Sequence, residues 1–305
     1  MDRDLLAHLP VVLAVARRGG FGAAAAELGM GASAVSHAVK TVEERLGAPL
    51  FARTTRSVAL TEAGASLMAS LSPAFEDIRA AIERLRSARG QVTGLLRINA
   101  PRVALPIAIT PVLIELARRH PDLVVEIAGD DGLTDIVAGG FDAGVRLGGM
   151  IAQDMIAVRL TLPFRAILVA APSYIEARGA PATIEDLARH NCIGYRLIAS
   201  GGVYAWDLAQ NGEDVSVKVR GTALVTDSTY AKALALEGVG IAYIFEPLVR
   251  TEIEEGRLVQ LLPRTAIEEP GLFLYYPRHA SNAPKLRAFI DAARDVLAPD
   301  AKAGG

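Results

Sequence analysis

The sequence predicts an α/β protein made of three successive units: a small helical head, one long helix and a larger α/β body. Residues 1–61 hold short amphipathic segments separated by glycine turns, which predicts several short helices. Residues 62–90 hold a heptad pattern of apolar side chains, and residues 91–305 alternate strand-like with helix-like segments. A chain of 305 residues, 51% of them hydrophobic, has the length and composition of a globular protein with two or three folding units.

The head is expected to begin with three helices. The first spans residues 5–18, where Pro10 is acceptable only if it lies in the first helical turn. A pair of glycines ends this helix, and the alanine-rich residues 21–28 form the second. After a Gly-Met-Gly turn, the third helix runs from Ser33 to Gly47 and reads "SAVSHAVKTVEERLG".

A hairpin is expected to follow the third helix. The segment Leu50–Thr61, "LFARTTRSVALT", predicts two short strands around a tip at Thr54–Arg56. The order helix, helix, tight turn, helix and hairpin is that of a winged helix-turn-helix. Residues 1–90 carry 11 Lys and Arg against 9 Asp and Glu, whereas residues 91–305 carry 21 against 25. A slightly basic head on an acidic body permits a nucleic-acid contact and does not require one.

The third helix has two opposite faces. Its apolar face is expected to pack on the second helix through Val35, Val39, Val42 and Leu46. The candidate DNA-binding residues lie on its polar face and in the hairpin, and they are Ser33, Ser36, His37, Lys40, Arg53, Thr54 and Arg56. Small hydroxyls and basic groups on a helix suit a major groove, and cations at a hairpin tip suit the backbone or the minor groove. For the helix alone a solvated surface face is the alternative interpretation, and the neighbouring hairpin favours DNA.

A long helix is predicted after Thr61, which is a suitable N-cap. Apolar side chains recur along it in the a/d pattern that is typical of a seam against a partner: Met68, Leu71, Phe75, Ile78, Ile82 and Leu85. Packing against the chain's own core is the alternative interpretation, and a position between two units favours a dimerising linker. Pro73 interrupts the pattern and predicts a kink at which the helix restarts.

From Val92 onward, the alternation of strands and helices predicts α/β units with mostly parallel sheets. Strands are predicted at residues 94–100, 123–129, 141–149, 164–172, 192–196, 223–227, 240–245 and 271–277. Helices are predicted at residues 111–120, 133–140, 228–237 and 284–297, with another capped by Thr183 and a hairpin turning at Asn211-Gly212. This order predicts two lobes that the chain crosses between twice, lobe I at about residues 91–162 and 267–300 and lobe II at about residues 163–266.

Three segments carry a resemblance to a known family: "FGAAAAELGM", "SAVSHAVKTVEERLGAPLF" and "RTTRSVALTEAG". They resemble, in turn, the second helix, the recognition helix and the wing of the LysR-type transcriptional regulators. "FDAGVRLG" and "GIAYI" resemble strands of that family's effector-binding domain, and the resemblance covers the whole chain, most densely the first 65 residues. The sequence departs from the family pattern at Gly22 and Gly31, where Ser or Thr is usual, and at His37, where Arg is common.

The resemblance implies a sequence-specific DNA-binding transcriptional regulator, modulated by a small-molecule effector in a periplasmic-binding-protein-like cleft between the lobes. It also implies a homodimer or homotetramer, and dimer symmetry predicts an inverted-repeat operator in double-stranded DNA. Ligands of α/β sheets collect beyond strand ends, where this chain has Ala100, Pro101, Arg102, Arg146, Ser200, Thr226, Asp227 and Phe245. Arg102 and Arg146 suit either a carboxylate effector or a structural salt bridge, and Asp227 suits a helix cap.

No enzyme motif is found in the sequence, which lacks the G-x-S-x-G, Walker A, G-x-G-x-x-G, H-E-x-x-H and paired-cysteine patterns. We therefore expect a protein that is not an enzyme, with no catalytic residue, no metal and no cofactor. The single cysteine, Cys192, leads a predicted buried strand and is interpreted as a core residue. One cysteine also excludes an intrachain disulfide and fits a reducing compartment.

The protein is expected to be cytoplasmic and to have no membrane partner. Its start, Asp2-Arg3-Asp4, is unlike a signal peptide, and its longest apolar runs, such as Leu9–Ala16, are shorter than the roughly 18–20 residues of a membrane span. A stand-alone solute-binding protein is the alternative function, since residues 92–305 alone would suit it. The winged head and the lack of a signal sequence argue against that alternative.

Overall fold

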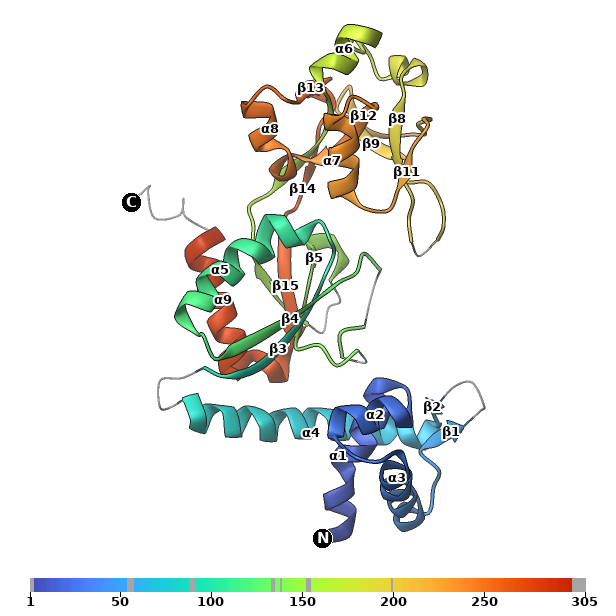
Figure 1. Ribbon diagram of the computed structural model, residues 1–305, viewed down its shortest axis with the longest axis vertical. Helices are drawn as coiled ribbons and strands as arrows, with labels where there is room; N and C mark the ends of the chain where they lie inside the picture. The colour runs from blue at the N-terminus through green and yellow to red at the C-terminus, as the bar shows by residue number, and fades with distance from the viewer. Residues whose placement is uncertain are drawn as a thin grey trace.

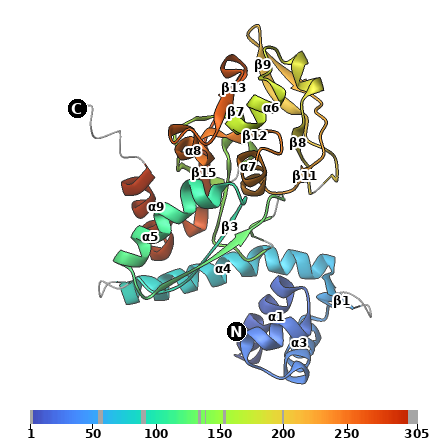
Figure 2. The same ribbon diagram turned by 45° about the horizontal axis from the view of Figure 1, so that its top comes forward.

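The computed structural model describes residues 3–53, 58–87, 92–132, 135–137, 139–151, 155–198 and 200–297. The α-helices of these residues are α1 (Arg3–Arg18), α2 (Phe21–Leu28), α3 (Ala32–Leu46), α4 (Glu62–Ser87), α5 (Thr110–Arg119), α6 (Pro172–Arg178), α7 (Ser228–Leu236), α8 (Arg250–Glu254) and α9 (Pro284–Leu297). The head and α4 lie at one end of the molecule, and two α/β lobes follow one above the other (Figures 1 and 2).

Most of the strands belong to two separate sheets. The strands are β1 (Phe51–Arg53), β2 (Val58–Leu60), β3 (Gly94–Ala100), β4 (Leu123–Gly129), β5 (Ala143–Leu147), β6 (Met155–Arg159), β7 (Phe164–Ala170), β8 (Cys192–Tyr195), β9 (Trp206–Gln210), β10 (Glu213–Val217), β11 (Leu224–Val225), β12 (Ile241–Phe245), β13 (Val259–Leu261), β14 (Ile267–Glu269) and β15 (Leu272–Pro277). The sheet with the order β4-β3-β5-β15-β6 defines lobe I, and the sheet with the order β11-β8-β12-β7-β13 defines lobe II.

The head is the predicted winged helix-turn-helix. Helices α1, α2 and α3 enclose a small core in which Val12, Val15, Val35, Val39 and Val42 are fully buried. Strands β1 and β2 pair antiparallel and form the base of the hairpin, while the tip at residues 54–57 lies outside the described residues. The apolar face predicted for the third helix is thus confirmed, except that Leu46 is exposed.

Both prolines expected to disturb a helix lie inside one. Pro10 is in the interior of α1 rather than in its first turn, so that expectation is wrong. Pro73 is inside α4, which continues through it, so the predicted restart is also wrong. Each helix is fixed by packing of its apolar face: Val11 and Val12 on one side of Pro10 and Met68 before Pro73 are all buried in the head core. Tertiary packing of this kind supplies most helical stability in proteins and offsets the lost hydrogen bond.

The heptad pattern of α4 is divided between two environments. Met68, Leu71 and Phe75 pack against the core of the head, which is the alternative interpretation of the pattern. Farther along, Ile78 and Ile82 are 55% and 47% exposed. The predicted N-cap is confirmed, because the Thr61 hydroxyl accepts a hydrogen bond of 3.0 Å from the Gly64 amide. The second half of α4 therefore presents apolar side chains that this chain does not cover.

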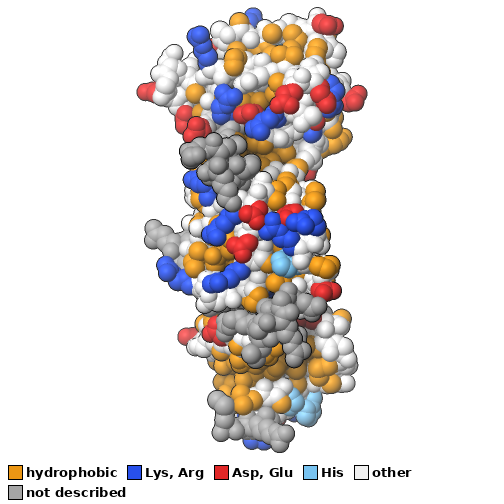
Figure 3. Space-filling view, turned by 90° about the vertical axis from the view of Figure 1, so that its left-hand side faces the viewer, with side chains coloured by type: hydrophobic (Ala, Val, Ile, Leu, Met, Phe, Trp, Pro, Cys, Tyr) orange, Lys and Arg blue, Asp and Glu red, His pale blue; other side chains and the backbone are white. Residues whose placement is uncertain are grey.

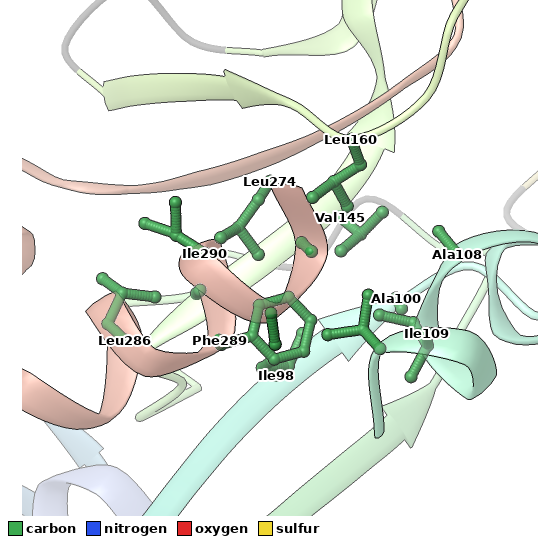
Figure 4. Packing of buried hydrophobic residues seen from close by; sticks show 14 of the residues in the cluster. Ile98, Ala100, Ala108, Ile109, Val145, Leu160, Leu274, Leu286, Phe289 and Ile290 are labelled. Carbon is green, nitrogen blue, oxygen red and sulfur yellow. The ribbon is translucent and has the colours of Figure 1, made fainter. Parts of the chain in front are cut away.

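Lobe I packs α5 and α9 against one side of its sheet. Figure 4 shows Phe289 of α9 lying among strand residues such as Ile98, and Leu286 and Ile290 belong to the same buried cluster. Strand β3 runs parallel to β4 and β5, whereas β15 runs antiparallel to β5 and β6. Four of the five strands, β4, β3, β5 and β6, therefore run in the same direction, which confirms the expectation of a mostly parallel sheet, and β15, which enters from lobe II, is the one antiparallel strand.

Lobe II has a similar mixed sheet in which β7 is antiparallel to β12, β13 and β14. The predicted hairpin is confirmed: β9 and β10 pair across Asn211 and Gly212, whose φ angles are 54° and 86°. Cys192 begins β8 and is buried, as predicted, and this burial raises the pKa of its thiol to about 12. The segment after Thr183 forms only a short 3-10 helix, Glu185–Arg189, whose N-cap is Ile184, so the predicted Thr183 cap is wrong. The Asp186 carboxylate inside this helix accepts from the amides of Ala182 and Thr183, which precede it.

The chain crosses between the lobes twice, as predicted. It leaves lobe I after β6 and returns between β14 and β15. The two crossing segments lie against each other, since the Leu160 amide donates to the Leu272 carbonyl at 2.8 Å. Gly271 has a φ of 86°, and a Cβ atom there would lie 2.7 Å from the Leu162 carbonyl oxygen. Only glycine fits this position, so the two crossing segments are closely packed.

One expected helix and several unexpected strands differ from the prediction. The helix predicted at residues 133–140 is wrong for the residues described there, because 135–137, 139 and 140 form turns, with Gly140 at a φ of 66°. Strands β6, β13 and β14 were not predicted at all. No helix among the described residues is both long and apolar enough to cross a membrane.

Candidate DNA-binding face and effector cleft

The outward face of α3 carries the polar residues singled out in the sequence. Ser33, His37 and Lys40 are exposed, while Val35 and Val39 on the opposite face have no accessible surface. Ser36 lies between the two faces and is partly buried. Gly31 caps α3 in an extended conformation without a side-chain hydrogen bond, so the departure from the usual Ser or Thr leaves the helix start intact.

Two glutamates on α3 have different surroundings. The Glu43 carboxylate accepts hydrogen bonds from the amides of Leu50 and Phe51, at 2.8 and 3.2 Å, and so fixes the start of the wing against α3. Glu44 lies 3.5 Å from the Lys40 ammonium, and both side chains are largely exposed. An exposed pair of this kind contributes little stability. The side chain of Arg53 and residues Thr54 and Arg56 lie outside the described part of the wing.

Among the described residues, the hydroxyl of Tyr195 forms a hydrogen bond between the two lobes. The Tyr195 hydroxyl at the end of β8 in lobe II lies 3.1 Å from an Asp131 carboxylate oxygen in lobe I. It also lies 3.0 Å from the carbonyl oxygen of Thr226. Asp131 in turn accepts from the amide of Arg102 at 2.8 Å and from its guanidinium at 3.3 Å. Burial and the adjacent Asp131 carboxylate raise the pKa of Tyr195 to about 12, so the phenol stays protonated at neutral pH.

Arg146 lies deep in the lobe I side of this site, with 3% of its surface exposed. Its guanidinium donates to the carbonyl oxygen of Val145 at 2.7 Å, to the Asn99 side chain at 2.6 Å and to the carbonyl oxygen of Gly132 at 2.7 Å. These three acceptors are neutral oxygen atoms. The buried cation is therefore hydrogen-bonded without being neutralised by any of them.

Asp227 is a helix cap, and it also faces the cleft. Its carboxylate accepts a 2.9 Å hydrogen bond from the Tyr230 amide at the start of α7. Partial burial alone would raise the pKa of Asp227, but hydrogen bonds from Thr229 and Tyr230 and the charge of Arg102 lower it. Asp227 is thus ionised, as a cap requires, and its charge reaches Arg102 across the cleft.

The remaining candidate effector-binding residues differ in their surroundings and in their exposure. Phe245 packs on Phe164, with ring centroids 5.1 Å apart, near the crossing between the lobes. Ala100 is fully buried, so it can offer a ligand only its backbone. Ser200 is exposed and accepts from the amide of Gly202 in its own loop. Among the residues that the structure describes, no group of three His, Cys, Asp or Glu side chains is arranged to hold a metal ion.

Sequence reasoning missed Asp131 and Tyr195, the two residues that join the lobes. Tyr195 is the last residue of β8, and Asp131 follows two residues after β4. Both therefore satisfy the same rule, proximity to a strand end, that selected Arg102 and Arg146. The polar pair "DD" directly after the apolar "LVVEIAG" was the available signal.

Two protein-family models match this sequence. The LysR substrate binding domain matches residues 89–298, and the bacterial regulatory helix-turn-helix protein of the lysR family matches residues 6–65. The chain therefore belongs to the LysR family of bacterial transcriptional regulators. It is a DNA-binding transcriptional regulator in which a winged head is joined to an effector-binding domain.

Relatives and solved structures extend over nearly the whole chain. The sequence is 40% identical over 278 residues to the uncharacterized HTH-type transcriptional regulator YcaN of Escherichia coli K12, covering 91% of each chain. It is 37% identical to the regulator PgrR of the same organism, covering 86% of this chain and 88% of PgrR. The structure of CrgA from Neisseria meningitidis is similar with a TM-score of 0.61 at 26% identity, covering 95% of this chain and 98% of CrgA. LysG of Corynebacterium glutamicum, solved with bound effector Arg, has the same fold with a TM-score of 0.63 at 20% identity, covering 95% of this chain and 98% of LysG.

Proposed function

We propose a division of labour in which residues 1–61 bind operator DNA, residues 62–90 dimerise and residues 91–305 bind the effector. In the head, α3 lies in the major groove with Ser33, His37 and Lys40 toward the DNA and Ser36 beside them. Arg53, Thr54 and Arg56 of the wing contact the backbone or the minor groove. The observation that carries this proposal is the contrast on α3 between exposed polar side chains and fully buried valines.

Replacing Lys40 or Arg53 by alanine is expected to weaken operator binding, because each change removes one cation from each subunit of the dimer on DNA. For each variant the slope of log K against log salt is expected to fall in magnitude by about 1.8, which is about 0.9 for each of the two neutralised phosphates. Titrations of labelled operator at several salt concentrations measure both quantities. Lys218→Ala, an exposed site on lobe II, is the control and should leave the slope unchanged. Slopes equal to that of the wild type in both variants would remove these residues from the interface.

Replacing His37 by alanine is expected to weaken operator binding, because the exposed imidazole on the polar face of α3 would no longer contact the DNA. The measurement is the dissociation constant for labelled operator at fixed pH and ionic strength. An affinity equal to that of the wild type would remove His37 from the interface.

We propose that the effector is a small organic anion that carries a carboxylate and enters the cleft between the lobes. The buried guanidinium of Arg146 donates to three neutral oxygen atoms, so its charge favours an anion on the lobe I side, whereas the charge of Arg102 is already paired with the Asp131 carboxylate. Pro101, Thr226, Asp227 and Phe245 would complete the walls, with the backbone of Ala100 below and Ser200 at the rim. The similar protein LysG was solved with bound effector Arg, a ligand that carries a carboxylate.

Thermal-shift screening of the purified protein tests the effector proposal. Small organic acids and aromatic acids are compared with their amides. A ligand present at a hundred times its Kd stabilises the folded protein by about 2.7 kcal/mol. Acids that raise the melting temperature while the matching amides do not would support the proposal. A compound that still raises the melting temperature of the Arg102→Ala and Arg146→Met variants would bind elsewhere. Hits among the amides alone would exclude the carboxylate.

The purified protein is expected to sediment as a homodimer or homotetramer, with α4 at the dimer contact. Exposed Ile78 and Ile82 leave an apolar strip on α4, and hydrophobic side chains also gather on the surface of the head (Figure 3). A dimer would place two α3 helices on an inverted-repeat operator. Analytical ultracentrifugation measures the mass, and a monomer at micromolar concentration would contradict the expectation.

We also propose a cytoplasmic, non-enzymatic regulator, in keeping with its family.

A further inference from the structure

The Tyr195 hydroxyl at the boundary of the two lobes has two hydrogen-bond acceptors for its one proton. Its oxygen atom lies 3.1 Å from a carboxylate oxygen of Asp131 in lobe I and 3.0 Å from the carbonyl oxygen of Thr226 in lobe II. A phenol has a single O–H donor, so it donates to only one of these acceptors at a time. Acceptors therefore outnumber donors at this hydroxyl, and a ligand group that carries several N–H donors would suit the place.

The charges that act on this hydroxyl are mainly negative. Burial is the main reason why the pKa of Tyr195 is raised, and the carboxylates of Asp131 and Asp227 act in the same direction. The charge of Arg102 opposes them, and it also acts on Asp227 itself. One guanidinium thus serves two carboxylates, so a cationic group of a ligand would compensate the charge that Arg102 leaves unbalanced.

The ion pair between Arg102 and Asp131 is partly open to water. The two charged groups are 3.3 Å apart, and the Arg102 side chain is 40% exposed. An ion pair with this much contact with water contributes little to stability. The Asp131 carboxylate has a second attachment, because it accepts a 2.8 Å hydrogen bond from the Arg102 backbone amide. Replacing the guanidinium by a ligand ammonium would thus cost the fold little and leave the carboxylate in position.

The Arg146 guanidinium lies beside this negative region. Gly132 directly follows Asp131 in the chain, and its carbonyl oxygen accepts from Arg146 at 2.7 Å. Three oxygen atoms of the described residues accept from this guanidinium, which carries more N–H donors than that. Consecutive Cα atoms are only about 3.8 Å apart. A region that suits a cation and a group that suits a carboxylate therefore contact neighbouring residues, and the two charged groups of an α-amino acid are likewise close together.

We propose that the ligand of the cleft is an amino acid, bound with its ammonium group between Asp131 and Asp227 and with its carboxylate toward Arg146. The ammonium supplies N–H donors to Asp131 and to the Thr226 carbonyl, which otherwise share one phenol proton. A carboxylate without an amine leaves the negative charge near Tyr195 unbalanced. The inference rests on the proposed function for the site and for the carboxylate. It narrows the organic acids to amino acids, of which the acidic ones are anions at neutral pH.

Thermal-shift titration of the full-length protein compares each common L-amino acid with two matched molecules. The deaminated acid keeps the carboxylate and has no ammonium, and the amide keeps the ammonium and has no carboxylate. At least one amino acid is expected to raise the melting temperature, and its deaminated acid is expected to bind at least about tenfold more weakly. Binding of deaminated acids as tight as that of their amino acids, or tighter, would overturn the inference and leave the carboxylate proposal standing. Binding of amides alone, or of no acid with or without an amine, would contradict the proposed function and the inference with it.

The place of the ammonium is tested with Asp227→Asn. Asparagine caps a helix as well as aspartate does, so α7 is expected to remain folded. The preference for an amino acid over its deaminated acid is expected to fall about fivefold or more, because the charge that attracts the ammonium is lost. Asp186→Asn is the matched control and should keep the wild-type preference. Its carboxylate also accepts from lobe II amides, but it lies before the start of β8, whereas Tyr195 ends that strand. A wild-type preference in both Asp227→Asn and Asp131→Asn would overturn the placement.

Discussion

Replacing Lys285 by alanine is expected to lower the free energy of unfolding of lobe I by roughly 3–5 kcal/mol, the usual cost of breaking a buried ion pair. The Lys285 side chain of α9 is 3% exposed and that of Asp142 is 10% exposed, and their charged atoms are 2.8 Å apart. Lys285 also donates to the carbonyl of Leu95, and Asp142 accepts from the amide of Arg97. Without the lysine, the largely buried Asp142 carboxylate beside β3 loses the ammonium group that lies 2.8 Å from it.

Native-state hydrogen exchange in β3 and β5 measures this effect in lobe I alone. Arg294→Ala on the same helix is the matched control. Arg294 and Asp291 are 3.8 Å apart, and both side chains are about two-thirds exposed. Losing such a surface pair is expected to cost at most about 1 kcal/mol. A double variant with Lys285→Met and Asp142→Asn should recover part of the loss, because neither side chain then carries a charge. Equal protection in Lys285→Ala and Arg294→Ala would contradict the expectation.

Replacing Gly64 by alanine is expected to abolish tight operator binding by forcing α4 away from the wing. A Cβ atom at Gly64 would lie 2.1 Å from the carbonyl oxygen of Leu50. That same oxygen accepts a 3.0 Å hydrogen bond from the Thr61 amide, which joins the wing to the start of α4. Backbone atoms cannot move aside as a flexible side chain can, so the head is expected to lose about 1–3 kcal/mol or more of stability.

Operator titration and thermal unfolding together measure the Gly64→Ala effect. A loss of about 1.4 kcal/mol in binding corresponds to a tenfold weaker dissociation constant, and we expect at least that. Gly22→Ala in α2 is the matched control, because no heavy atom lies within 4 Å of its Cβ position. Alanine is favoured over glycine in a helix by roughly 0.5–1 kcal/mol, so this control should be neutral or stabilising. A Gly64→Ala protein with normal operator affinity would show that the wing and α4 tolerate separation.

Elements with strong local signals were predicted well from the sequence. β3 and β4 have the expected bounds, and α9 runs from Pro284 to Leu297 as predicted, because alternation, periodicity and a starting proline are all local properties. β6, β13 and β14 were missed, since these short strands are defined by their pairing with β15 or β7. The prediction that Pro10 lies in a first helical turn failed because buried valines around it stabilise the helix through contacts with other parts of the head.

The candidate sites were likewise predicted where the signal is local and missed where it depends on distant residues. The two faces of α3 follow from helical periodicity, so its exposed and buried residues were separated correctly apart from Leu46. The cleft depends on pairs that are remote in sequence. Tyr195 and Asp131 are 64 positions apart, and Arg146 meets Asn99 across 47 positions. Strand ends indicated where a ligand site forms, but no local pattern indicates which side chains meet there.

The buried state of Cys192 has a practical consequence for spectroscopy. The chain has one cysteine, and burial keeps its thiol protonated and inaccessible to reagents at neutral pH. The natural protein is therefore a ready background for thiol-specific labels. A cysteine introduced at an exposed site such as Lys218 would carry a single fluorophore, and the opening of the two lobes could then be followed in solution without replacing any other native residue.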